Sequence, residues 1–178
     1  MESTPPQQQD LGTMVGLFWI QSAETYLGMP PVPSAPGVLL SPAGPQVVGP
    51  DPLQFSWSDV TDLRVTEAPV RSTAARWAAR AANFAAAALN AWVPGSPAEM
   101  TVVIAVGGNE YKTPVFSGAS SAYTQWAVDL SLGLLARFVR GTSSPVVMSD
   151  WYHGDRQRSV VLASWHRVAL LESWLQDE

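Results

Sequence analysis

Cysteine is absent from this chain of 178 residues. Its absence excludes a disulfide framework, a thiolate nucleophile, and zinc or iron–sulfur sites held by cysteine. Such a composition fits the reducing cytoplasm, where we expect this protein to work. Charge is also sparse, because only 14% of the residues are Asp, Glu, Lys or Arg, against roughly 25% in typical globular domains. A surface with so few charges favours contact with other proteins.

Basic residues and long apolar runs are scarce as well. The chain has 10 Lys and Arg against 15 Asp and Glu, a net charge of −5, and so lacks the positive footprint of a nucleic-acid binder. Residues 74–93 are the longest candidate for a membrane span, but arginines and asparagines interrupt them and most are alanine. Residues 1–10 are acidic and polar where a signal peptide is basic and apolar. We expect a soluble protein with no nucleic-acid partner and no cleaved signal.

Histidine, the usual general base at neutral pH, is limited to His153 and His166. Asp150 and Asp155 flank His153, and their carboxylates could orient its imidazole or share a metal with it. Alternatively, these acids are turn and cap residues before a last helix, and the aromatic residues between them only pack. We favour that reading and predict no catalytic residue, metal or cofactor. A small-molecule enzyme that uses Asp150, His153 and Asp155 stays an alternative.

Several segments before residue 141 alternate apolar and polar residues as antiparallel strands do. Residues 1–14 bury almost nothing, so we predict a disordered tail and place the domain at residues 15–141. Residues 15–27 predict one strand or two short ones, and a proline-rich loop follows at residues 29–37. Further predicted strand segments are residues 38–40 and 46–48 as a hairpin, residues 53–65 as two segments joined by a kink, and residues 100–106 and 110–116 joined by a Gly107-Gly108-Asn109 turn.

Three segments have helical patterns. Residues 72–93 are predicted to form an Ala-rich helix inserted among the strands, and Thr124–Arg140 are predicted to form a buried helix that Gly141 ends. Residues 142–178 are predicted to form a helical extension that begins with a loop and continues as a helix from about Arg156 to Leu175. One face of this last helix is predicted to be buried against other protein, and we favour a partner over the chain's own sheet. That face consists of Val161, Trp165, Val168, Leu171 and Leu175.

The order of elements gives an α+β class: a bent antiparallel sheet or partly open barrel that a helix caps. Gly16-Leu17-Phe18-Trp19-Ile20, leading to Tyr26-Leu27-Gly28 and then to a W-x-x-V-x-x-L motif at Trp57, Val60 and Leu63, resembles uncharacterised bacterial pleckstrin-homology-like (PH-like) proteins. The resemblance covers residues 15–141 and implies a fold that binds lipids, peptides or proteins. The inserted helix and the extra C-terminal helix depart from it. The loop at residues 29–37 has no basic residue, which argues against phosphoinositide binding in the family's usual mode.

Eight tryptophans are many for this length, and aromatic residues are enriched at binding hot spots as well as in cores. Trp19 and Trp57 follow strand patterns and are predicted to be core residues. The inserted helix could pack on its own sheet or bind a partner. The predicted partner-binding residues lie on the two additional helices: Trp77, Phe84, Trp92, Trp165, Val168, Leu171 and Trp174.

These observations predict a non-catalytic protein-binding or scaffold module. The PH-like core and the accessory helices would support homo- or hetero-oligomeric assembly, with a protein partner or a second copy of the chain. A peripheral membrane adaptor is an alternative that follows from the family resemblance, although the two arginines of the inserted helix are too few for electrostatic capture by a membrane.

Overall fold

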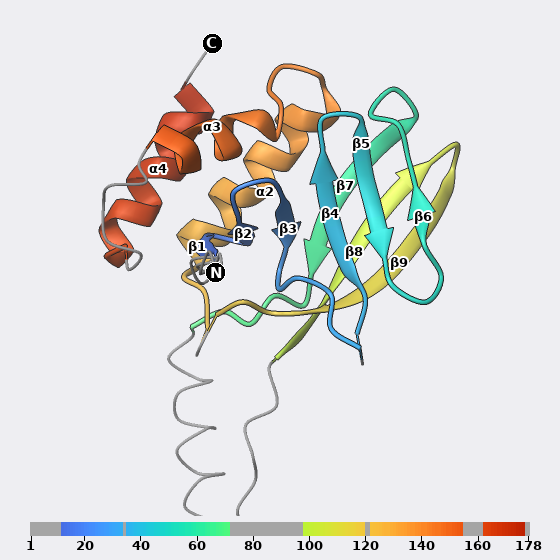
Figure 1. Cartoon of the computed structure of the whole chain (residues 1–178), viewed down its shortest axis with the longest axis horizontal. Coiled ribbons are helices and arrows are strands. Elements are labelled where there is room, and N and C mark those ends of the chain that lie inside the picture. Colours follow the sequence, from blue (N-terminus) through green and yellow to red (C-terminus); the bar gives the residue numbers. More distant parts are fainter. Residues whose placement is uncertain (1–11, 34, 72–97, 120–121, 155–161, 177–178) are drawn as a thin grey trace, which may run out of the picture.

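The computed structural model describes residues 12–33, 35–71, 98–119, 122–154 and 162–176 (Figure 1). Within them the chain is α+β, with two antiparallel sheets on one side and helices on the other. The strands are β1 (Thr13–Val15), β2 (Phe18–Ile20), β3 (Thr25–Leu27), β4 (Gly37–Ser41), β5 (Gly44–Val48), β6 (Leu53–Gln54), β7 (Val60–Thr66), β8 (Glu99–Val106) and β9 (Asn109–Phe116). The helices are α2 (Gln125–Val139), α3 (Val146–Gly154) and α4 (Ser164–Gln176).

The first sheet is a six-stranded meander in which each of β1 to β5 pairs with the next strand in sequence. Turns of two residues join β1 to β2 and β4 to β5, because Val15 pairs with Phe18 and Ser41 pairs with Gly44. The hairpin predicted at residues 38–48 is therefore confirmed. The segment predicted at residues 15–27 consists of three short strands, and the first of them begins at Thr13. Thr13 and Met14 are thus part of the sheet, and the predicted disordered tail extended too far by these two residues.

The second sheet has three strands, β7, β8 and β9. The β8–β9 hairpin closes over Gly107 and Gly108, whose φ angles of +58° and +85° belong to the left-handed region that a two-residue hairpin turn requires. This confirms the hairpin predicted from the glycine pair. The predicted kink within residues 53–65 separates the two sheets, since the Val60 and Asp59 amides both donate to Ser56 O between β6 and β7. One bent sheet was predicted; the structure has two sheets and no closed barrel among the described residues.

The core lies between the sheets and α2. Met29 N donates to Phe116 O over 2.8 Å, which ties the chain after β3 to β9 and joins the two sheets. Trp57, between β6 and β7, packs edge-on against Phe138 of α2 with ring centroids 6.0 Å apart. Trp57 is thus partly buried against the core, as predicted. The largest fully buried side chains include Phe18, Leu27, Ile104, Leu134 and Phe138.

Helix α2 has the boundaries that its sequence predicts. The Thr124 hydroxyl accepts a hydrogen bond from Ala127 N and caps the start, while Gly141 follows the end at a φ of +69°. The inserted helix predicted at residues 72–93 lies outside the described residues. Two predictions after residue 141 were wrong: the expected loop contains α3, and the last helix begins at Ser164 within the described residues. No helix among the residues placed by the structure has the length and apolar character needed to cross a membrane.

Candidate functional site

Helices α2 and α4 lie side by side and run in the same direction (Figure 1). Trp126, in the first turn of α2, donates from Nε1 to Glu172 Oε1 of α4 over 3.3 Å. Farther along both helices, the Arg137 guanidinium donates to Leu175 O. The two helices therefore begin at the same end of the molecule.

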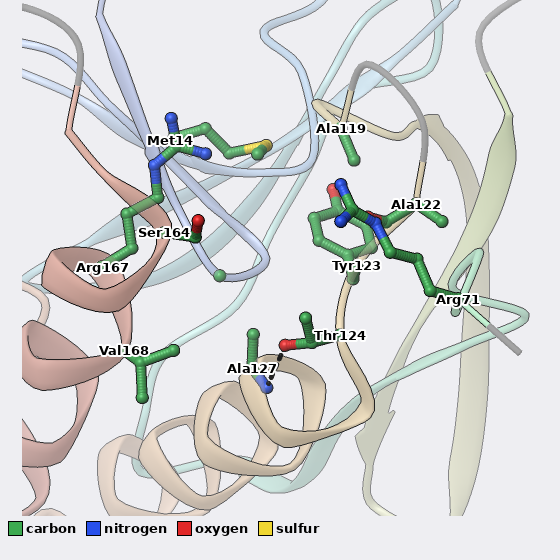
Figure 2. A pocket seen from close by; sticks show the side chains of 11 residues that line it. Met14, Arg71, Ala119, Ala122, Tyr123, Thr124, Ala127, Ser164, Arg167 and Val168 are labelled. Atoms are coloured by element: carbon green, nitrogen blue, oxygen red, sulfur yellow. Dashed lines mark hydrogen bonds between the residues drawn. The ribbon is translucent and has the colours of Figure 1, made fainter.

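A pocket of about 170 Å³ opens where the two helices begin (Figure 2). Its walls come from the starts of α2 and α4 and from β1 with the turn that follows it. The residues just before α2, and Arg71, which follows β7 and bonds to Tyr123, complete the walls. The lining residues are Met14, Gly16, Arg71, Ala119, Ala122, Tyr123, Thr124, Ala127, Ser164, Arg167 and Val168. Segments far apart in the sequence thus build one concave site.

The turn between β1 and β2 forms the floor of this pocket and is fixed between the two helices. Leu17 N donates to Ser131 Oγ over 3.1 Å, and Ser131 Oγ donates to Ala127 O over 2.7 Å. Gly16 has a φ of +57°, and a Cβ on it would lie 2.3 Å from Ser131 Oγ and 2.9 Å from Leu171 Cδ1. Only glycine fits here without displacing a neighbour. The floor is therefore held by contacts between distant parts of the chain.

Two arginines give the pocket a positive charge. Figure 2 shows Arg167 rising from α4 on one side, and Arg71 reaching toward Tyr123 from the other. Arg71 Nε donates to Ala122 O over 3.1 Å, and Arg71 N donates to Tyr123 O. No acidic residue is present among the described lining residues. The pocket is thus positive although the chain as a whole carries a net charge of −5.

Hydroxyl groups and helix ends complete the polar lining. Burial raises the pKa of Tyr123 above its ordinary value of 10.0, so its hydroxyl stays neutral at physiological pH and accepts a hydrogen bond from Gly118 N. Thr124 and Ser164 stand at the starts of α2 and α4, where backbone N–H groups and the helix dipole favour negative charge. This lining suits an anion better than a cation.

Two large aromatic side chains remain exposed on the same two helices. Trp165 follows Ser164 and is 70% exposed, and Trp126 precedes Ala127 and is 56% exposed. The Trp165 ring stacks on His166 at a centroid distance of 4.5 Å and an interplanar angle of 8°. Trp165 was predicted to bind a partner, whereas Trp126 was missed. Trp126 lies in the first turn after a capping threonine and away from the buried stripe of α2, and this position is a signal in the sequence that predicts an exposed tryptophan.

Other predicted site residues lie elsewhere. Leu171 and Trp174 are 0% and 5% exposed and belong to the chain's own core, which corrects their assignment as partner-binding residues. Their burial also corrects the preference for a partner as cover of the last helix. Trp165, which belongs to the same predicted face, is not covered by the chain itself. Val168 is partly buried and lines the pocket. Trp77, Phe84, Trp92 and Val161 lie outside the described residues.

The residues of the alternative enzyme site do not come together as a pocket in the described part of the chain. Asp150 and His153 lie on α3, one turn apart and exposed to solvent, and they are not in the loop that was predicted there. Asp155 lies outside the described residues. Among the residues that are described, no group of three His, Asp or Glu side chains is placed to hold a metal ion.

Comparisons of the chain with protein-family models, with curated proteins and with solved structures found no match. The chemistry of the site therefore has to be argued from its own residues.

Proposed function

We propose that this chain is a non-catalytic protein-binding module, and that it assembles with a different protein through the surface where α2 and α4 begin. The observation that carries the proposal is the exposure of Trp126 and Trp165 on neighbouring helices. Tryptophan is enriched at binding hot spots, since its large apolar area gains much from burial and its few rotatable bonds lose little entropy. Two such side chains beside a pocket are a typical anchor for a partner.

The rigidity of the two helices supports this assignment. Leu134 and Leu135 of α2 and Leu171 of α4 are fully buried, so the core fixes both helices. The bond between Trp126 and Glu172 also restrains one of the two indoles. Aromatic side chains on fixed elements lose less conformational entropy on binding than side chains on loops.

The charge of the pocket favours a different protein over a second copy. A symmetric dimer uses the same patch on both subunits, and would bring the pockets that contain Arg71 and Arg167 toward each other. Like charges across an interface cost free energy, whereas an acidic partner would complement them. We therefore select hetero-oligomeric assembly, with a partner that presents an acidic segment, from the two assemblies that the sequence left open.

We propose in addition that the architecture follows the PH-like plan. Antiparallel strands come first, and α2 closes the domain after the last of them, which supports this assignment. Helices α3 and α4 would then be additions to the plan. On this view the added helix α4 supplies one half of the binding surface, and the closing helix α2 supplies the other.

A double variant, Trp126→Ala with Trp165→Ala, tests the proposed function. Both side chains are exposed, so we expect each substitution to change the free energy of unfolding, measured by thermal denaturation, by no more than about 0.5 kcal/mol. Leu53→Ala, which truncates an exposed apolar residue of β6, is the matched control. The wild type and the control should retain the same partner protein from a lysate of the native cells, and the double variant should lose it.

Sedimentation of the purified chain completes this experiment, and a monomer is expected. A stable dimer that depends on the two tryptophans would contradict the hetero-oligomeric proposal. Equal retention of every protein by the wild type and the double variant would contradict the binding surface itself. Binding to anionic liposomes that survives the double substitution would favour the membrane-adaptor alternative instead.

A further inference from the structure

Arg167 carries a buried donor that nothing nearby satisfies. Its Nε atom is inaccessible to solvent and has no hydrogen-bond partner within the described part of the chain. The residue as a whole is half-buried in the wall of the pocket, on the first turn of α4. Because its guanidinium is always charged, this donor cannot be neutralised by loss of a proton.

Leaving such a group unpaired is costly. A buried donor without an acceptor costs about 1–3 kcal/mol, and more when the group is charged, so native structures leave few of them. The nearby side chains give no relief, because the described lining contains no carboxylate. A turn of the Arg167 side chain that brings its guanidinium to an acceptor from another molecule would remove this cost.

Several other groups around the pocket favour the same kind of ligand. Arg71 adds a second positive charge on the opposite wall, and the Ser164 and Thr124 hydroxyls line the space between the two arginines. The starts of α2 and α4 add two positive dipole ends. A volume of about 170 Å³ accommodates one small group and excludes a large ligand.

We propose that this pocket binds a carboxylate of the partner protein, from an acidic segment, and that the Arg167 side chain turns on binding so that its guanidinium donates to one of the carboxylate oxygens. This inference rests on the proposed function and assigns the chemistry that its partner must present. Arginine pairs with carboxylates through charge-assisted hydrogen bonds, which are roughly twice as strong as neutral ones. Trp126 and Trp165 then contact apolar side chains that flank the acidic residue.

Side-chain NMR of the arginine Nε–Hε groups tests the pocket directly in the full chain. The probe is a capped peptide with the sequence N-acetyl-Ala-Glu-Glu-Ala-amide, and its isosteric control replaces both glutamates with glutamine. The Arg167 resonance should shift saturably with the first peptide and stay unchanged with the second. Arg64, an exposed arginine of β7, should not shift with either peptide.

Substitution and a second anion give further outcomes. Arg167→Gln should weaken binding of the glutamate peptide at least tenfold, while Arg64→Gln should leave it unchanged. If the glutamate peptide causes no saturable shift, or if both peptides shift Arg167 equally, the carboxylate assignment is wrong. Tighter binding of inorganic phosphate than of the glutamate peptide would also overturn it, in favour of a phosphate ligand. The wild-type titrations decide the matter even if Arg167→Gln does not fold.

The two proposals can fail separately. A saturable glutamate titration together with equal protein retention by the double tryptophan variant would support the pocket and contradict the binding surface. Loss of the partner on tryptophan substitution, without any glutamate titration, would support the surface and contradict the carboxylate.

Discussion

Gly16 and Gly107 occupy two-residue turns with nearly the same φ angle, +57° between β1 and β2 and +58° between β8 and β9. Their surroundings are opposite. A Cβ on Gly107 would meet nothing within 4 Å, whereas a Cβ on Gly16 would collide with Ser131 and Leu171. The β8–β9 turn needs glycine for its backbone alone. The β1–β2 turn also needs it because two helices cover it.

The largest expected effect comes from one alanine substitution made at each of these two turns. Gly16→Ala should lower the free energy of unfolding by about 2–5 kcal/mol, since a left-handed alanine costs roughly 1–2 kcal/mol and overpacking adds about 1–3 kcal/mol. Gly107→Ala should cost only the strain of the left-handed alanine, roughly 1–2 kcal/mol. Urea denaturation of both variants measures the difference. Equal losses would mean that the helices do not constrain the β1–β2 turn.

Serine hydroxyls repeat the comparison on a smaller scale. Ser131 is fully buried and accepts from Leu17 N, so Ser131→Ala should cost about 1–3 kcal/mol for a donor left unpaired. Ser41 bonds to Gly44 N and O within its own partly buried hairpin, and Ser41→Ala should cost about 0.5–1.5 kcal/mol. Thermal unfolding of the two variants provides the test. A larger loss for Ser41→Ala would reverse the ranking of distant over local contacts.

The cap of α2 is a local device that borders the pocket. Thr124→Ala removes the acceptor for Ala127 N and should cost about 1 kcal/mol. For a chain of this size, that loss lowers Tm by about 2–4 °C. Thr61→Ala, at an exposed hydroxyl of β7 that donates to Ala105 O, is the control and should stay within about 0.5 kcal/mol. A Tm equal to that of the control would show that the cap is not needed.

The smallest effect concerns an exposed ion pair between residues distant in sequence. The Arg64 guanidinium on β7 bonds to the Glu110 carboxylate on β9 and lowers the pKa of that carboxyl below its ordinary value of 4.5. A carboxyl with a lowered pKa adds stability above its ordinary pKa, and that stability is lost as pH falls through the folded value.

Arg64→Gln should raise the pKa of Glu110 toward 4.5, as carboxyl NMR titration would measure. The free energy of unfolding at neutral pH should change little in this variant, because exposed ion pairs contribute little to stability. A marked loss of stability would mean that separation in sequence matters even without burial.

What the sequence predicted follows the same division between local and distant contacts. The β8–β9 hairpin and α2 were found because glycine turns, a capping threonine and regular spacing act within a few residues. The separation into two sheets depends on where a kinked chain finds its partners, and no local pattern encodes that choice. Helix α3 was missed because the acids around His153 resembled turn residues.

The candidate site was harder to predict for a related reason. Trp165 was predicted to bind a partner because of its residue type, and the structure shows only that its side chain is exposed. Arg71, Tyr123 and Arg167 meet only after β1, α2 and α4 have packed together. Their separation in the sequence hides the pocket, since none of them belongs to a short motif.

The close fit between the β1–β2 turn and Leu171 also sets an order of events in folding. A ribosome makes residues 16 and 17 long before it makes residue 171, so the turn emerges without its cover. The pairing of β8 with β9 lies within a short stretch and can form in about 1–10 microseconds once that stretch is made. The side of the turn at Gly16 that Leu171 covers stays exposed until α4 has left the ribosome. Completion of the core therefore waits for the synthesis of α4, and nascent chains stalled before α4 should expose this apolar surface to chaperones.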